Sequence, residues 1–148
     1  MSGQHVRLFH ASQRSVHYRV YYWAEFDKLK AMFENTEFTG YTRSTPNIVV
    51  YGDIHEAFML PVVGGRLVNA GSIGNPTDRI PMASYCILHG RLDSAKHAPI
   101  DIEFVRVAFD NEGAIEIARA ANMPDLAEYA FEVRNGRYRR HMPKGYIP

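Results

Sequence analysis

The segment Asn47–His55 reads NIVVYGDIH and sets the architecture that the rest of the chain must fit. Its apolar residues Ile48 to Tyr51 predict a central strand covered on both faces, since such strands lack polar alternation. Asp53 and His55 follow directly, two positions apart, a spacing that points both side chains to the same side of an extended chain. The pattern therefore predicts a buried strand with a carboxylate and an imidazole at its carboxyl end.

A second apolar run with a polar end lies upstream. Residues His5–Ala11 (HVRLFHA) predict a short buried strand that carries His10 to its carboxyl end. Gly64 and Gly65 form a hairpin signal, because glycine tolerates the positive φ that tight turns need. The further strands that we expect are Ala57–Val63, Arg66–Ala70, Ala83–Leu88 and Asp101–Asp110.

Two segments have helical character. Residues Glu25–Glu34 place apolar groups at the i, i+3 and i+7 spacing of one helical face. Residues Asn111–Asn122 predict a second helix, with Asn111 as its N-cap and Pro124 closing it. The chain is therefore expected to form one α/β domain over residues 1–148, a mixed β-sheet with flanking helices.

Two other segments are rich in cationic and aromatic residues. Ser12–Ala24 has no clear period and predicts a loop, and Arg134–Lys144 is interpreted as a solvated basic tail. The loop suits either a surface that stacks on rings and binds phosphates, or a segment that buries its aromatic residues.

Composition narrows the function classes. A net charge of +1 over 148 residues argues against nucleic-acid binding by bulk charge. A single cysteine excludes a disulfide framework and a thiolate zinc cage, and it favours a reducing compartment. The sequence shows no secretory signal and no apolar run long enough for a membrane span. We therefore expect a cytoplasmic protein without membrane or nucleic-acid partners.

His10, Asp53 and His55 are the candidate metal ligands. Ligands of α/β sheets gather beyond the carboxyl ends of neighbouring strands, which would bring these three side chains together. Two imidazoles and one carboxylate suit Mn, Fe, Zn or Ni better than Ca or Mg. The competing interpretation is that each histidine is an ordinary structural or surface residue.

The order of motifs around this site resembles a known family. Tyr51–His55, then Gly64–Pro76, then Ala83-Ser84-Tyr85 resemble the carboxy-terminal half of the calcineurin-like metallophosphoesterases, in particular the small bacterial ones. That family has a Gly-His-x-His motif after a strand, then a hairpin, an Asn-Pro-Gly-Ser-type loop and a strand opening Ala-Ser-Tyr. The resemblance implies half of a four-layer α/β/β/α sandwich.

The resemblance also implies roles for the three ligands. His10 looks like the family's isolated metal-binding histidine, and His55 matches the second histidine of Gly-His-x-His. Asp53 stands where the first histidine is expected, a change that favours harder metals such as Mn or Mg. By this assignment His10 and Asp53 would hold one divalent metal and His55 the other, with manganese the expected cofactor and Mg, Fe, Zn or Ni as alternatives.

The family's upstream motifs have no counterpart here. The bridging aspartate and the catalytic imidazole would precede His10, where this sequence has only nine residues, so the catalytic residues are unknown. The first interpretation is a metal-dependent phosphoric ester hydrolase present as its C-terminal half, inactive or nearly so alone, whose N-terminal half could be a separate chain. The alternatives are a non-catalytic binding or oligomerisation module that retains the fold, and an enzyme with a reduced mononuclear site.

The expected substrate is a small phosphate ester or a nucleotide. Asn69 and Ser72 lie in a loop of small residues whose backbone N–H groups could cradle a phosphate, although the loop could also be a simple turn. Arg14 and His17 are the cationic residues after His10 that are expected to touch the anion. Missing N-terminal strands would leave a free sheet edge and an uncovered apolar face, which predicts a homo-oligomer.

Overall fold

The computed structural model describes residues 1–40 and 44–147. Its main sheet contains β1 (Val6–Phe9), β2 (Ile48–Tyr51), β3 (Ala57–Val62) and β4 (Gly65–Ala70). A separate hairpin is formed by β5 (Ala83–His89) and β6 (Asp101–Val107). The helices are α1 (Phe26–Ala31), α2 (Asn111–Ala120), α3 (Leu126–Asn135) and the short 3-10 helix η1 (Arg139–His141).

The main sheet is mixed, with strand order β1-β2-β4-β3. β2 runs parallel to both of its neighbours, and β3 returns antiparallel to β4. All four residues of β2 are buried, as the uniform apolar run predicted. The parallel pairing of β1 with β2 brings their carboxyl ends to one edge of the sheet, where the Gly52 N–H donates to the His10 carbonyl at 2.9 Å.

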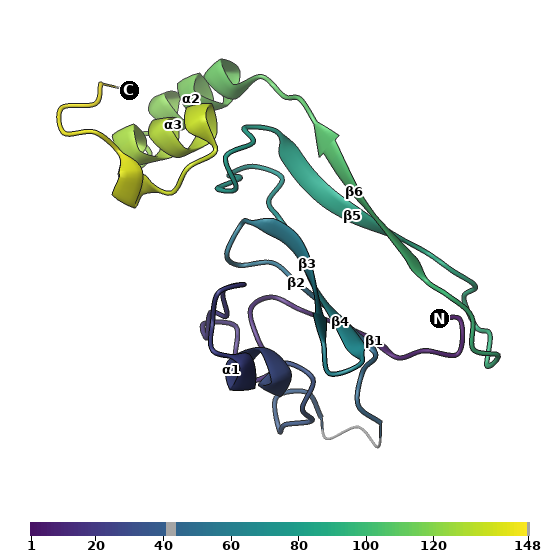
Figure 1. Cartoon of the computed structure of the whole chain (residues 1–148). Coiled ribbons are helices and arrows are strands. Elements are labelled where there is room, and N and C mark those ends of the chain that lie inside the picture. Colours follow the sequence, from purple (N-terminus) through teal and green to yellow (C-terminus); the bar gives the residue numbers. More distant parts are fainter. Residues whose placement is uncertain (41–43, 148) are drawn as a thin grey trace.

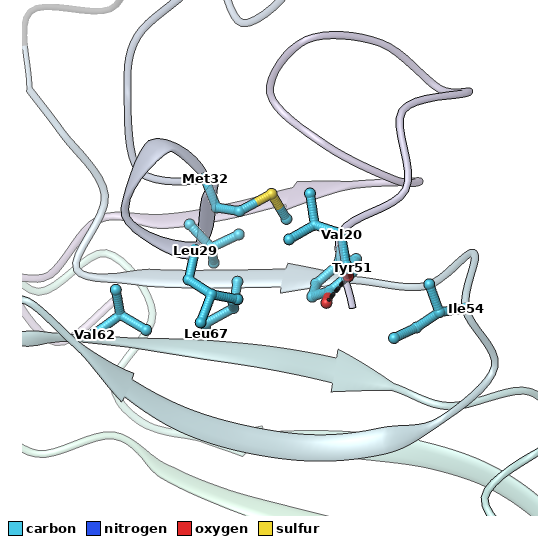
Figure 2. Close-up of a cluster of buried hydrophobic side chains, with 8 residues drawn as sticks. Val20, Leu29, Met32, Tyr51, Ile54, Val62 and Leu67 are labelled. Carbon is cyan, nitrogen blue, oxygen red and sulfur yellow. Dashed lines mark hydrogen bonds between the residues drawn. The ribbon is translucent and has the colours of Figure 1, made fainter. Parts of the chain in front are cut away.

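One face of the sheet is covered by α1 and by the segment that precedes it. Figure 2 shows the apolar side chains that fill this layer. They come from the loop, from α1 and from the strands: Val20, Leu29, Met32, Val49, Tyr51, Ile54, Val62 and Leu67. The Tyr51 hydroxyl donates to the Val20 carbonyl at 2.5 Å, so its one polar atom is satisfied. The predicted loop over residues 12–24 therefore also contributes to the core.

The other face packs against the β5-β6 hairpin, which runs alongside the sheet in Figure 1. Every second hairpin residue, including Cys86, Leu88, Ile102 and Phe104, points at the sheet. The intervening positions face outward, and no helix in the described part of the chain lies along that outer face (Figure 1). The layers are thus a helix, a mixed sheet and a second small sheet, which fits the predicted half of a four-layer sandwich.

Helices α2 and α3 pack on each other beyond one end of the hairpin (Figure 1). The N-cap of α2 is Asp110, whose carboxylate accepts from the Gly113 N–H at 2.9 Å, so the prediction of Asn111 was wrong. The Asn111 side chain instead donates to the Val133 carbonyl at 3.1 Å and joins the two helices.

The segment Arg134–Lys144 is mostly exposed, as the prediction of a solvated tail required, but it is structured. Its first two residues complete α3, which the sequence analysis did not predict, and a short 3-10 helix follows at Arg139–His141. The reason is pairing with distant groups, since Arg134 bonds both oxygens of Glu112 and Arg139 bonds the buried Glu132. Within the described residues, no helix combines the length and the apolar character that a membrane span requires.

Candidate active site

The carboxyl ends of β1 and β2 deliver His10 and Asp53 to the same place. After β2 the chain turns sharply, with the Ile54 N–H donating to the Gly52 carbonyl at 2.7 Å. Asp53 and His55 both adopt left-handed backbone conformations, with φ of 58° and 59°, which are uncommon outside glycine. Buried Ile54 anchors this turn, and Thr77 bonds its carbonyl at 3.1 Å. The surrounding contacts thus hold a strained turn, a feature found often at functional sites.

Asp53 lies between the His10 imidazole and the Arg19 guanidinium. Its Oδ1 is 3.4 Å from His10 Nε2, and its Oδ2 accepts from Arg19 Nε at 3.0 Å. The Asp53 side chain is only 8% exposed, whereas that of His10 is 59% exposed. The charge of Asp53 raises the pKa of the Arg19 guanidinium above its ordinary value. The parallel strand pairing therefore produces the contact between His10 and Asp53 that the sequence predicted.

His55 is oriented by a backbone carbonyl. Its Nδ1 lies 2.8 Å from the Asn75 oxygen, and a carbonyl can only accept, so Nδ1 carries the proton. In the neutral ring the Nε2 lone pair is then free. Metal-binding histidines are commonly fixed in this way, with one ring nitrogen donating to a carbonyl and the other left for the metal. His55 therefore has the tautomer that ligation requires.

His10, Asp53 and His55 all line one cavity of about 390 Å³. Arg19 and Tyr21 also line this cavity, and they belong to the segment Ser12–Ala24 that the sequence analysis considered as a phosphate-binding surface. The lining residues that the sequence analysis missed come from the end of the chain: Glu132, Tyr138, Arg139 and Arg140. The sequence feature that could have identified these lining residues is the high density of arginine and tyrosine in both segments. Because the tail had been interpreted as solvated, its residues were not assigned to the site.

Glu132 anchors this cavity from α3. Its side chain is 1% exposed, and its Oε1 accepts from the Arg139 backbone at 2.9 Å and from Arg139 Nε at 3.2 Å. Its Oε2 accepts from Asn75 Nδ2 at 2.8 Å. A buried carboxylate needs such partners, because an unpaired buried charge is costly. Glu132 thus fixes both the loop that orients His55 and the segment that supplies Arg139.

The donor types suit a divalent cation, but the donors are not gathered into a metal site. Among the described residues, no group of three or more His, Cys, Asp or Glu side chains is placed to hold a metal ion. His10 and Asp53 are in contact, whereas His55 lines the same cavity without joining them. Arg19 occupies the second oxygen of Asp53, where a cation could otherwise bind.

Asn69 and Ser72 shape the loops around the cavity without lining it. Asn69 is fully buried, donates to the Gly52 carbonyl and accepts from the Gly71 N–H at 3.0 Å. The Ser72 hydroxyl accepts from the Asn75 N–H at 3.0 Å. Both residues therefore support the turn of Asp53 and the loop of Asn75, and their predicted contact with a phosphate stays a prediction.

Arg14 and His17 are not brought to this cavity. The Arg14 guanidinium lies 5.0 Å from the ring centre of Tyr18, a cation–π contact, and the side chain borders a shallow hollow with Phe38. His17 is exposed and lines neither this cavity nor the hollow beside Arg14. The residues of this segment that do line the cavity are Arg19 and Tyr21.

The fold has counterparts among solved structures. No protein-family model matches the chain, and no curated protein matches it significantly. A hypothetical protein from Pyrococcus horikoshii OT3 superposes with a TM-score of 0.64 at 14% identity, over 93% of this chain and 48% of that one. A metallophosphoesterase from Sphaerobacter thermophilus superposes with a TM-score of 0.59 at 17% identity, over 90% of this chain and 55% of that one.

These superpositions define the class of fold. The mixed α/β arrangement is that of a calcineurin-like metallophosphoesterase, as the motif order predicted. The chain spans about half the length of the two structures, which fits the expected half of the sandwich. At this level of identity the similarity establishes the fold alone.

Proposed function

We propose that the chain provides the second half of the active site of a metal-dependent phosphoric ester hydrolase. The observation that carries this proposal is the cavity in which His10, Asp53 and His55 lie with three arginines. The sequence pattern selected these three side chains, and the parallel pairing of β1 with β2 supports the proposal because it brings His10 and Asp53 into contact, while His55 lines the same cavity. The calcineurin-like fold supports the same reaction class.

The residues of the chain have distinct tasks in this proposal. Arg19, Arg139 and Arg140 attract the phosphate group of the ester, because guanidinium groups bind phosphate oxygens through paired N–H donors. His10, Asp53 and His55 would hold a divalent metal, with Mn first and Mg, Fe, Zn or Ni as alternatives. When bound, that metal would supply a Lewis acid for the phosphoryl oxygen. His55 contributes an unprotonated Nε2, held by Asn75.

The site is proposed to be incomplete within this sequence. A binuclear phosphoesterase centre needs a bridging carboxylate, and the chain spans only 48–55% of the structures that it resembles. We propose that the missing groups come from residues outside this sequence, including an N-terminal half supplied as a separate chain. The chain alone is then inactive or nearly so.

A second candidate function is a non-catalytic binding module that retains the fold. The specific observation in its favour is that Arg19 already neutralises Asp53 at 3.0 Å, while no three-ligand group is assembled among the described residues. Such a module would bind the phosphate ester through its arginines without turning it over.

Manganese titration by calorimetry separates the two candidates. The proposal predicts saturable Mn²⁺ binding that is lost in His10→Ala and in His55→Ala. The matched control is His89→Ala, since His89 lies on β5 and pairs with the exposed Glu103. Equal Mn²⁺ binding by all four proteins would refute the assignment of these ligands, and absence of Mn²⁺ binding by the folded chain would refute metal binding by these three side chains without the missing half. A model phosphodiester assayed in the same buffer reports turnover.

A further inference from the structure

A second cavity, of about 480 Å³, adjoins the one around His10. The two have a common wall made by Glu56, Thr77, Tyr138 and Arg140. The rest of the second cavity is lined mainly by cationic and aromatic side chains: Tyr22, Trp23, Phe58, Arg79, Arg137 and His141. A ligand that contacts the common wall can therefore reach both cavities.

The second cavity carries an excess of positive charge. Among the described residues no carboxylate pairs with Arg79, Arg137 or Arg140. Asp78 lines the cavity, but it is already bonded by both Arg106 nitrogens and by the Ala57 N–H. Arg140 Nε donates to His141 Nε2 at 3.1 Å, which leaves its charge unneutralised. Guanidinium groups without a carboxylate partner that line one hollow favour an anion, above all a phosphate.

Glu56 is the remaining carboxylate of this cavity. Burial raises the pKa of Glu56, and Asp78 raises it further, while Arg140 and Arg79 oppose that shift. Arg79 and Arg140 therefore act electrostatically on the interior of the cavity.

Backbone pairing fixes the positions of two of these arginines. Asp78 and Arg137 form an antiparallel bridge, and the Arg79 N–H donates to the Gly136 carbonyl at 2.5 Å. Gly136 has φ of 58°, and a Cβ there would lie 2.7 Å from the Ile80 nitrogen. Only glycine allows this approach of the two segments. Arg79 and Arg137 are thus held side by side by the fold.

The second cavity is also lined by aromatic rings. Trp23 is 60% exposed although its ring stacks on Tyr21, with centroids 4.9 Å apart and planes 13° apart. Tyr22 is 50% exposed and meets the edge of Phe58 at 5.8 Å. Exposed aromatic rings beside cationic side chains suit a ligand with both a planar ring and a phosphate.

We infer that the second cavity is a nucleotide subsite, in which Arg79, Arg137 and Arg140 bind a phosphate and Trp23 stacks on the base. The inference goes beyond the proposed function, because it assigns a nucleotide ligand to a cavity beside the one proposed to hold the ester phosphate. It does not depend on the proposed reaction, since binding in this cavity requires no metal.

Trp23 is the single tryptophan of the chain, so its fluorescence reports on this cavity alone. Titration with AMP in the presence of EDTA is expected to quench the emission saturably. Arg79→Gln and Arg137→Gln are each expected to weaken AMP binding about tenfold, the loss typical of one charge-assisted contact. The control is Arg91→Gln, because Arg91 is exposed and lies in the connection between β5 and β6. Inorganic phosphate is expected to compete with AMP without the same quenching.

The outcomes that would overturn the inference are distinct from those that test hydrolysis. Absence of saturable quenching, or equal AMP affinity in Arg137→Gln and Arg91→Gln, would exclude the nucleotide subsite. If circular dichroism shows that Arg137→Gln is unfolded, the AMP affinity of Arg79→Gln tests the same subsite. Failure to bind Mn²⁺ would refute metal binding by this chain alone and leave the AMP result standing, since EDTA is present throughout the AMP titration.

Discussion

Asn75 donates a hydrogen bond to Glu132 at 2.8 Å, between residues 57 positions apart in the sequence. This contact joins the loop after β4 to helix α3. The Asn75 carbonyl orients His55, while the other oxygen of Glu132 holds Arg139. The terminal helices therefore contribute directly to the cavity around His10 and Asp53, although they lie beyond the main sheet.

Glu132→Ala should destabilise the fold strongly. The substitution leaves the Asn75 amide and the Arg139 guanidinium without their buried acceptor, so the free energy of unfolding should fall by about 2–4 kcal/mol. Urea denaturation measures the change. Glu116→Ala is the control, since Glu116 is exposed and should change stability by less than about 1 kcal/mol. Equal stability of Glu132→Ala and the wild type would show that the network is not structural.

Arg19→Gln should strengthen divalent metal binding. Arg19 occupies one oxygen of Asp53, and a cation at that carboxylate must compete with the guanidinium. Removal of the like charge should raise the affinity for Mn²⁺ by about threefold to tenfold. Calorimetry measures it, with Arg14→Gln as the control because Arg14 contacts Tyr18 instead. A weaker affinity for Mn²⁺ in Arg19→Gln would mean that Arg19 does not compete with the metal.

The main sheet could be predicted because short local stretches of the sequence determine its strands. The strands of the main sheet are short and mostly apolar, and the polar residues His10 and Asp53 follow closely after the ends of β1 and β2. The parallel register then follows from the rule that ligands of α/β sheets meet at the carboxyl edge. The contact between His10 and Asp53 is thus an outcome of local pattern and topology.

The C-terminal part could not be predicted because its stabilising contacts are distant. Helix α3 begins after Asp125, which has a left-handed backbone conformation and caps nothing with its side chain, so a start signal is lacking. Its buried face includes Glu132, although a glutamate is expected from sequence alone to be exposed. Its burial becomes favourable only with Asn75 and Arg139, and no local pattern shows that these residues meet.

Gly136→Ala should disrupt the pairing that places Arg79 beside Arg137. The new Cβ would meet Ile80 backbone atoms at 2.7 Å, in addition to the penalty for a left-handed conformation. We expect a loss of about 2–4 kcal/mol in the free energy of unfolding. Gly145→Ala is the control, because Gly145 also has a positive φ but nothing within 4 Å, so it isolates the conformational penalty. Equal losses in the two variants would contradict the close approach.

The outer face of the β5-β6 hairpin should mediate self-association. Tyr85, Ile87 and Val107 on this face are 38–46% exposed, and β5 pairs only with β6 in the described structure. Exposed apolar sheet faces with free edges favour association. Sedimentation should show a concentration-dependent species larger than a monomer, and Ile87→Lys should abolish it. Ile117→Lys changes an exposed isoleucine on α2 and should leave association unchanged. A monomeric wild type would contradict the prediction.

Glu56→Gln should remove a pH dependence of stability. Burial holds the pKa of Glu56 above its ordinary value of 4.5 in the folded chain, so the folded state binds this proton more tightly than the unfolded state. The stabilising contribution of the protonated Glu56 side chain is therefore fully present below the pKa of the unfolded state. It is lost as the pH rises through the higher pKa of the folded state. Glutamine carries no charge, so the variant should gain stability relative to the wild type between about pH 4 and about pH 7.

Urea denaturation at both pH values measures this difference, and Glu37→Gln controls for the substitution at an exposed site. Glu56→Gln also removes a carboxylate from the second cavity, and in the described structure no cation forms an ion pair with that carboxylate. The affinity for AMP should therefore rise at neutral pH. Parallel pH profiles of Glu56→Gln and the wild type would show that burial does not perturb this carboxylate. A fall in AMP affinity would show instead that Glu56 assists binding, because its charge would then orient the arginines rather than oppose the phosphate.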